Sequence, residues 1–193
     1  MNLAPVYIGQ DRIEKWKPVH LGWRNRAIRV TGAIESGKTL FIRRLLDYLP
    51  QRAEVIGYAG SVRDQAVYPE FFHFGELDGF HDAVTAQVAQ RWDGDTERPL
   101  VIVADKWAGT KGVPLDDIRR VARHGERLNA YVFFEDRNRA AGPFRQDFGD
   151  IKPTLVTMTR GEGLVAYDRG SDLLRFSHLP ATRAASGVAG SGV

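Results

Sequence analysis

The chain has 193 residues and contains no cysteine. Disulfides, zinc sites with cysteine ligands and catalysis by a thiol are therefore all excluded. The sequence also has no apolar run near the roughly 20 residues that span a bilayer. Its beginning has neither the basic start nor the apolar segment of a signal peptide. We therefore expect no transmembrane segment and a cytoplasmic location.

The charge balance is close to even, with 27 basic and 24 acidic residues and a net charge of +3. This balance permits an anionic partner such as DNA, but it is too small to indicate one. A chain of this length and composition is typical of one soluble α/β domain with a buried core. We place that domain at residues 1–180, with lead-in strands in 1–26, and expect the Ala/Gly/Ser-rich stretch 181–193 to be a disordered tail.

Residues 32–39 fit the phosphate-loop pattern G-x-x-x-x-G-K-[ST] at every fixed position. A short strand pattern at 27–30 precedes them, and apolar residues at helical spacing follow at 40–49. The two glycines let backbone N–H groups turn toward phosphates, and the helix N-terminus adds the positive end of its dipole. The residues expected to bind nucleotide are Gly32, Ala33, Ile34, Glu35, Ser36, Gly37, Lys38, Thr39 and Leu40.

Within this loop we expect Lys38 to reach the β- and γ-phosphates and Thr39 to place its hydroxyl on Mg²⁺. Ser36 would help to hold the loop, and Glu35 would point to solvent. The alternative is a glycine-rich turn between strand and helix that fits the pattern by chance.

Residues 100–105 form a continuous apolar run that ends in an acid. This pattern predicts a buried parallel strand that delivers Asp105 to the carboxyl edge of the sheet. Asp105 would then bind the water shell of Mg²⁺ opposite Thr39. The alternative is an acid that merely opens the next loop. Many ATPases have a glutamate after this aspartate to polarise the attacking water, whereas here the next residue is Lys106.

The rest of the chain alternates strand and helix patterns, which predicts an α/β fold. The strand at 54–58 and the strand before the loop would form a βαβ unit. The aromatic-rich stretch 61–79 reads as an irregular connection in which the rings pack. Further strands are expected at 130–134 and 154–158, helices at 82–92 and 114–128, and a closing hairpin at 164–167 and 173–176. Glu135 and Asp136 follow the strand at 130–134 and would lie beside the nucleotide.

Three groups of residues resemble the FtsK/SpoIIIE domain and the wider FtsK/HerA motors. The first is the lead-in Gly9-Gln10-Asp11 followed by Pro18-Val19. The second is Ala122-Arg123-His124-Gly125 ahead of the strand at 130–134, similar to the A-R-x-G element. The third is Gly161-Glu162-Gly163-Leu164 with the closing hairpin. The resemblance covers roughly residues 6–179. It implies a P-loop NTPase with a RecA-like core, a mostly parallel central sheet flanked by helices, and a C-terminal β-hairpin.

The resemblance also implies a function. Members of this family are ring-forming ATPases that move double-stranded DNA, including chromosome translocases, conjugation pumps and viral genome-packaging ATPases. It implies ATP and Mg²⁺ as cofactors, a homo-oligomeric ring, and a portal, capsid or membrane-channel partner. A viral member would be associated with the virion. Arg123, or failing it Arg127, would act on the nucleotide of a neighbouring subunit.

Two departures from the family pattern bear on hydrolysis: the pair Asp105-Lys106, and Glu135-Asp136-Arg137 in place of the T-Q-R sensor. Glu135 or Asp136 could take over the positioning of water. The expected catalytic residues are therefore Lys38, Asp105, Glu135, Asp136 and Arg123. Two other functions stay open: a small P-loop kinase, although no lid segment is evident, and an ATP-binding protein that has lost hydrolysis.

Overall fold

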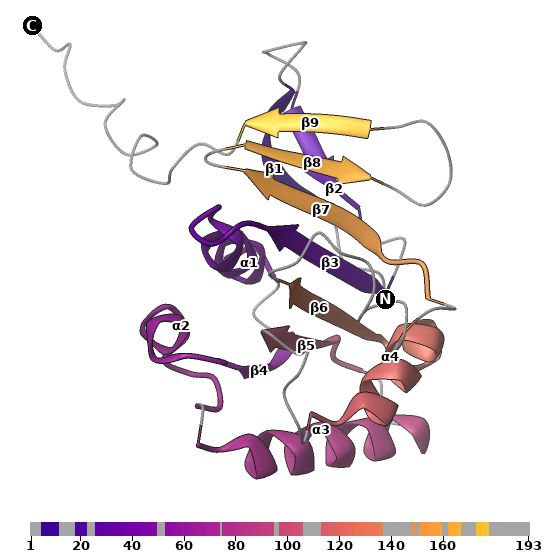
Figure 1. Cartoon of the computed structure of the whole chain (residues 1–193). Helices are drawn as coiled ribbons and strands as arrows, with labels where there is room; N and C mark the ends of the chain where they lie inside the picture. Colours follow the sequence, from indigo (N-terminus) through magenta and orange to yellow (C-terminus); the bar gives the residue numbers. More distant parts are fainter. Residues whose placement is uncertain are drawn as a thin grey trace, which may run out of the picture.

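The protein folds around one nine-stranded sheet with the strand order β2-β1-β9-β8-β7-β3-β6-β5-β4 (Figure 1). The computed structural model describes residues 5–11, 18–22, 26–49, 53–73, 75–94, 97–105, 113–136, 148, 151–159, 162–166 and 173–177. The strands are β1 (Val6–Asp11), β2 (Pro18–Leu21), β3 (Ala27–Gly32), β4 (Glu54–Tyr58), β5 (Leu100–Asp105), β6 (Ala130–Asp136), β7 (Thr154–Thr159), β8 (Glu162–Ala166) and β9 (Leu173–Ser177). The helices are α1 (Lys38–Asp47), α2 (Val62–Val67), α3 (Leu77–Trp92) and α4 (Leu115–Leu128).

The sheet has a parallel and an antiparallel half. Strands β7, β3, β6, β5 and β4 are parallel neighbours, whereas β8, β9, β1 and β2 pair in antiparallel fashion. The predicted C-terminal hairpin is confirmed, because β8 pairs with β9 from Glu162↔Ser177 to Ala166↔Leu173. The lead-in strands join the sheet through this hairpin, since β1 pairs with β9. The expected α/β fold with a mostly parallel core is therefore confirmed.

The order of the parallel strands corrects one expectation. The βαβ unit predicted from β3, α1 and β4 does not make these strands neighbours, because β6 and β5 lie between them. The described side chains of β5 and β6 are buried, as their apolar sequences favour, so these strands occupy the centre of the parallel half. The strand β4 takes the edge, where Val55 is exposed.

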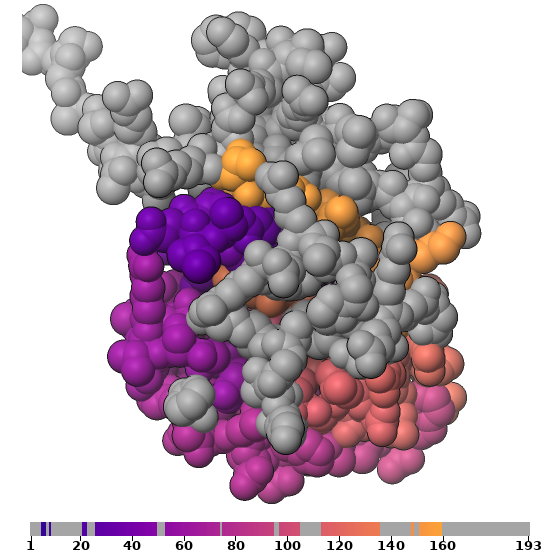
Figure 2. All heavy atoms as spheres, in the orientation of Figure 1, coloured from indigo at the N-terminus to yellow at the C-terminus, as the bar shows by residue number. Residues whose placement is uncertain are grey.

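Two apolar layers cover the two faces of the sheet. Along β5, Val101 and Val103 belong to the layer that contains α1, while Leu100 and Ile102 belong to the layer that contains α3 and α4. This alternation follows from the two-residue period of a strand. The residues of α4 in the second layer are Ile118, Val121 and Leu128, which recur at helical spacing. In the space-filling view, the residues of α3 and α4 adjoin along the lower part of the molecule (Figure 2).

The helix limits follow local sequence signals. Helix α1 begins directly after Gly37, and α4 ends at Leu128, where it is capped by Asn129 in a left-handed conformation with φ 46°. Helix α3 begins at Leu77, earlier than the expected start at residue 82. Helix α2 was not expected, although Ser61-x-x-Asp64 is a capping sequence. Within the part of the chain that the structure describes, no helix is both long and apolar enough to cross a membrane.

The aromatic residues between β4 and α3 pack, as expected. Tyr68 and Phe71 are buried and stack with ring centroids 4.5 Å apart. Phe72 approaches Phe80 of α3 edge-on at 6.2 Å. The expectation for Phe74 and for the tail at 181–193 lies outside the described residues. This connection is therefore a packed layer beside α1 that contains a short helix.

Candidate nucleotide-binding site

The loop from Gly32 to Thr39 leaves the carboxyl end of β3 and opens helix α1. Gly32 lies so close to β7 that an added Cβ would meet the carbonyl oxygen of Met158 at 2.5 Å, and would also clash with Ser36. Gly37 has φ 90°, a left-handed conformation that glycine adopts without strain. The fixed glycines of the motif are thus required by the backbone itself, one for space and one for conformation.

Lys38 is buried inside its own loop. Its side chain is 5% exposed, and Nζ donates to the carbonyl oxygens of Gly32 at 3.0 Å and Ala33 at 2.9 Å. Phosphate oxygens are stronger acceptors than neutral carbonyls, because the bond is then assisted by charge on both sides. The lysine is therefore held where it could exchange these carbonyls for the phosphates of a nucleotide.

Thr39 faces a buried carboxylate. Its Oγ1 lies 3.2 Å from both carboxylate oxygens of Glu135, which is 3% exposed and projects from β6, the neighbour of β3. A hydroxyl and a carboxylate are oxygen donors of the kind that Mg²⁺ prefers. The chemistry of this pair therefore fits the expected metal, with Glu135 as a carboxylate that faces Thr39.

The positions of the other two expected acids, Asp105 and Asp136, are known from the pairing of their strands. The Cα of Asp105 pairs with that of Glu135 across β5 and β6, and Asp136 pairs with Thr31 of β3. Both expected acids therefore end strands at the same sheet edge as the loop. Their side chains, like all of Lys106, lie outside the described residues. Among the residues whose side chains are described, no group of three or more histidines and acids forms a metal cluster.

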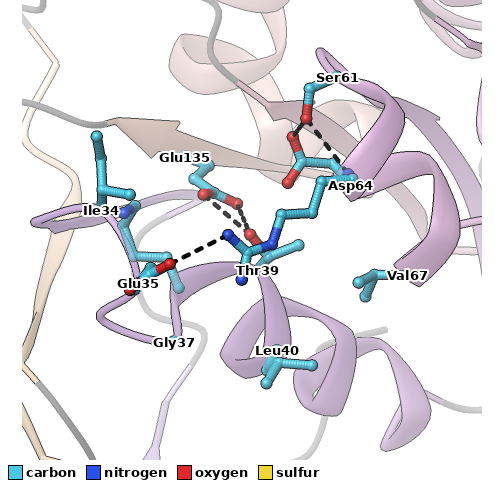
Figure 3. Close-up of a pocket in the computed structure, with 11 residues that line it drawn as sticks. Ile34, Glu35, Gly37, Thr39, Leu40, Ser61, Asp64, Val67 and Glu135 are labelled. Carbon is cyan, nitrogen blue, oxygen red and sulfur yellow. Dashed lines mark hydrogen bonds and ion pairs between the residues drawn. The ribbon is translucent and has the colours of Figure 1, made fainter.

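A cavity of about 390 Å³ lies between the loop and helix α2 (Figure 3). Six of the nine residues expected to bind nucleotide line it on the loop side: Ile34, Glu35, Gly37, Lys38, Thr39 and Leu40. Glu135 lines it as well, so the structure brings Glu135 together with most of the predicted loop residues. Gly32, Ala33 and Ser36 shape the loop from outside this lining, and the Ser36 hydroxyl is buried.

The wall formed by α2 was missed by sequence analysis. It contributes Ser61, Arg63, Asp64 and Val67. The Asp64 backbone N–H donates to the Ser61 hydroxyl at 3.3 Å, and that hydroxyl donates back to the Asp64 carboxylate, which is 6% exposed. The S-x-x-D signal could have located this capped helix, but not its position beside the loop.

Two contacts join this wall to the loop and to α1. The Tyr68 hydroxyl donates to the carbonyl oxygen of Thr39 at 2.6 Å. Arg63 forms an ion pair with Glu35, with Nη1 and Oε1 3.4 Å apart. Glu35 is exposed, as expected, but it has this arginine as a partner.

The structure does not bring Arg123 to the cavity of its own chain. Arg123 is exposed on α4, which packs on the opposite face of the sheet from α1. Arg127 lies 4.1 Å above the ring of Trp92, so it is engaged in packing between α4 and α3. Both arginines are exposed on α4.

The chain matches no protein-family model and no curated protein sequence. Solved structures do match. A protein named only as an ATPase is 13% identical over 91% of this chain and 87% of its own length, with a TM-score of 0.69. ATPases 2 and 3 of EccC from Thermomonospora curvata, in complex with a signal sequence peptide, are 17% identical over 92% of this chain, with a TM-score of 0.67. The pCW3 conjugation coupling protein TcpA, with ATPγS, is 14% identical over 90% of this chain, with a TM-score of 0.67.

The chain spans 41% of that EccC chain and 65% of the TcpA chain. At these identities the likeness concerns the fold. The chain therefore shares the fold of these ATPase domains, as the resemblance in the sequence implied.

Proposed function

We propose that this protein binds ATP with Mg²⁺ in the cavity between the 32–39 loop and α2, and hydrolyses it. One observation carries the proposal: Lys38, Thr39 and the buried Glu135 meet in this cavity at the carboxyl edge of a parallel sheet. Ligands of open α/β sheets bind at this edge. The cavity of about 390 Å³ is also within the range of small-molecule sites.

The side chains that line the cavity have different proposed roles, which follow from their chemistry. Lys38 and the N-terminus of α1 would neutralise phosphate charge. Thr39 and Glu135, with Asp105 from the neighbouring strand, would hold Mg²⁺, which would supply positive charge to offset the negative charge of the phosphates. The Thr39 hydroxyl already contacts the carboxylate of Glu135. Glu135 would therefore orient the other ligands of the metal.

The attacking water also needs an acceptor, and Lys106 is not one. Two buried carboxylates line the cavity from opposite walls, Glu135 and Asp64 (Figure 3). Glu135 is engaged by Thr39, whereas Asp64 is fixed by its helix cap at Ser61. We assign the metal side to Glu135 and the orientation of water to Asp64. Asp136 remains a candidate from the resemblance in the sequence.

We further propose that ATP turnover drives movement of double-stranded DNA by a ring of copies of this chain. The support is the family resemblance of the sequence, the fold shared with a conjugation coupling protein, and the exposed Arg123 on α4. Such a motor would work in the cytoplasm, or at a virion if viral, against a portal, capsid or membrane channel.

A polypeptide cargo is a second candidate, because one structure of this fold holds a signal sequence peptide. The test is ATP turnover at low salt with and without random duplex DNA, together with the mass in solution with and without nucleotide. A DNA motor should be stimulated without sequence preference, and its affinity for DNA should fall steeply with salt.

The other results of this test are equally informative. A monomer whose turnover ignores DNA would rule out the DNA motor and favour the kinase or a peptide cargo. Bound ATP without turnover would favour the binding protein. The folded Lys38→Ala variant is the control for adventitious ATPase activity, because it should be inactive in every case.

A further inference from the structure

Glu35 is an acid inside a loop that is proposed to bind phosphates, and its backbone is unusual. It has φ 64°, a left-handed conformation that non-glycine residues adopt at some cost. Its carboxylate reaches Arg63 of α2 at 3.4 Å, so the ion pair joins the two walls of the cavity. The side chains are 77% exposed for Arg63 and 59% for Glu35. Ion pairs this exposed are weak, so a stronger partner could take over the arginine.

The charges around the cavity indicate what that partner would be. The described lining has three acids, Glu35, Asp64 and Glu135, and two bases, Lys38 and Arg63, which gives 2 − 3 = −1. A nucleoside triphosphate brings several more negative charges into this space. Lys38 is already enclosed by the loop, so Arg63 is the lining cation that can be moved at little cost. While it pairs with Glu35, its charge is not available to the phosphates.

We propose that Arg63 exchanges Glu35 for the terminal phosphate of a bound nucleoside triphosphate, in the same chain, and so distinguishes the triphosphate from the diphosphate. The loop encloses the phosphates from one side, whereas Arg63 comes from the facing wall. A guanidinium can bind phosphate oxygens with two parallel bonds, which a single carboxylate contact at 3.4 Å does not match. Glu35 then pairs with Arg63 only while no triphosphate is bound. This inference rests on the nucleotide site proposed above.

The experiment is a calorimetric titration of Mg²⁺-ATPγS and of Mg²⁺-ADP. Arg63→Gln should weaken ATPγS binding by about 10-fold or more, the usual effect of losing a charge-assisted bond, and leave ADP within about 2-fold. Glu35→Gln should strengthen ATPγS binding, because its competitor is removed. In the variant that combines Glu35→Gln with Arg63→Gln, this increase in ATPγS affinity should be absent. Arg63→Lys, which keeps the charge but not the paired bonds, should fall between wild type and Arg63→Gln.

Arg43→Gln is the matched control. It removes the same charge from α1, where Arg43 pairs with Asp47 and Glu70 away from the cavity lining. Equal weakening of both nucleotides by Arg63→Gln, or no weakening, would overturn the inference. The inference would also be overturned if Glu35→Gln raised the affinities for ADP and for ATPγS equally and this increase persisted in the variant that combines Glu35→Gln with Arg63→Gln. That result would indicate a general effect of charge. If the wild-type chain binds neither nucleotide, the proposed function itself fails.

Discussion

Replacing Glu135 by glutamine would test how the buried carboxylate serves the site. The substitution keeps the size and one acceptor oxygen but removes the charge that faces the Thr39 hydroxyl at 3.2 Å. A hydrogen bond to a charged group contributes about 1.5–3 kcal/mol, which corresponds to a factor of about 10 to 150 in rate or affinity. If Glu135 orients the metal, Glu135→Gln should lower ATP turnover by such a factor and raise the Mg²⁺ concentration that turnover requires.

The same substitution should not weaken the fold. Glu135 is 3% exposed, and burying its charge costs free energy that a neutral amide largely avoids. The thermal midpoint of Glu135→Gln should therefore equal or exceed that of the wild type. The assay is steady-state ATP turnover against Mg²⁺ concentration, with thermal unfolding of the same samples.

The matched control is Glu54→Gln, which removes a carboxylate that pairs with the buried Arg91 at 3.2 Å, far from the cavity lining. It should lower stability and spare turnover, the opposite pattern. Wild-type turnover and Mg²⁺ dependence in Glu135→Gln would refute the reasoning, because the contact with Thr39 would then be structural only.

Two further outcomes follow from the geometry of the site, and one follows from the family resemblance. Asp64→Asn should lower turnover by about 100-fold or more, as for loss of a general base, with ATP affinity unchanged in titrations; unchanged turnover would return the role to another acid. Mixing Arg123→Ala with Lys38→Ala subunits should restore some turnover if the site is shared, since such an arginine can contribute about 10³-fold in rate; no restoration in an assembly shown to mix counts against sharing. Gly32→Ala should lower the free energy of unfolding by about 1–3 kcal/mol in denaturant titrations, because its Cβ meets a backbone oxygen; a wild-type value would contradict that clash.

Local patterns in the sequence predicted most of the elements. The phosphate-loop motif, the apolar run at β5 and the closing hairpin each depend on residues close together in the chain, and each is where it was expected. Helix α2 was missed because six residues are too few to show helical periodicity, and its capping signal lies among aromatic residues.

The site was only partly predictable, because its partners come from distant parts of the chain. That Glu135 meets Thr39 depends on β6 lying beside β3, a pairing between segments about a hundred residues apart. The wall with Arg63 and Asp64 depends likewise on how α2 packs against α1, which Tyr68 fixes through the carbonyl of Thr39. Strand order and helix packing are set by the whole core, and no local pattern encodes them.

Binding of the ATP phosphates by the 32–39 loop can be measured by an equilibrium titration of Mg²⁺-ATPγS into the wild-type chain and into Lys38→Ala. Thermal unfolding shows that both proteins are folded. Lys38 donates to two carbonyls of its own loop, so its loss should leave the sheet intact and remove the cation that the phosphates require. We expect saturable binding by the wild type and no measurable binding by the folded Lys38→Ala chain at the same concentrations. Equal affinity in the two proteins would show that the 32–39 loop does not bind the phosphates.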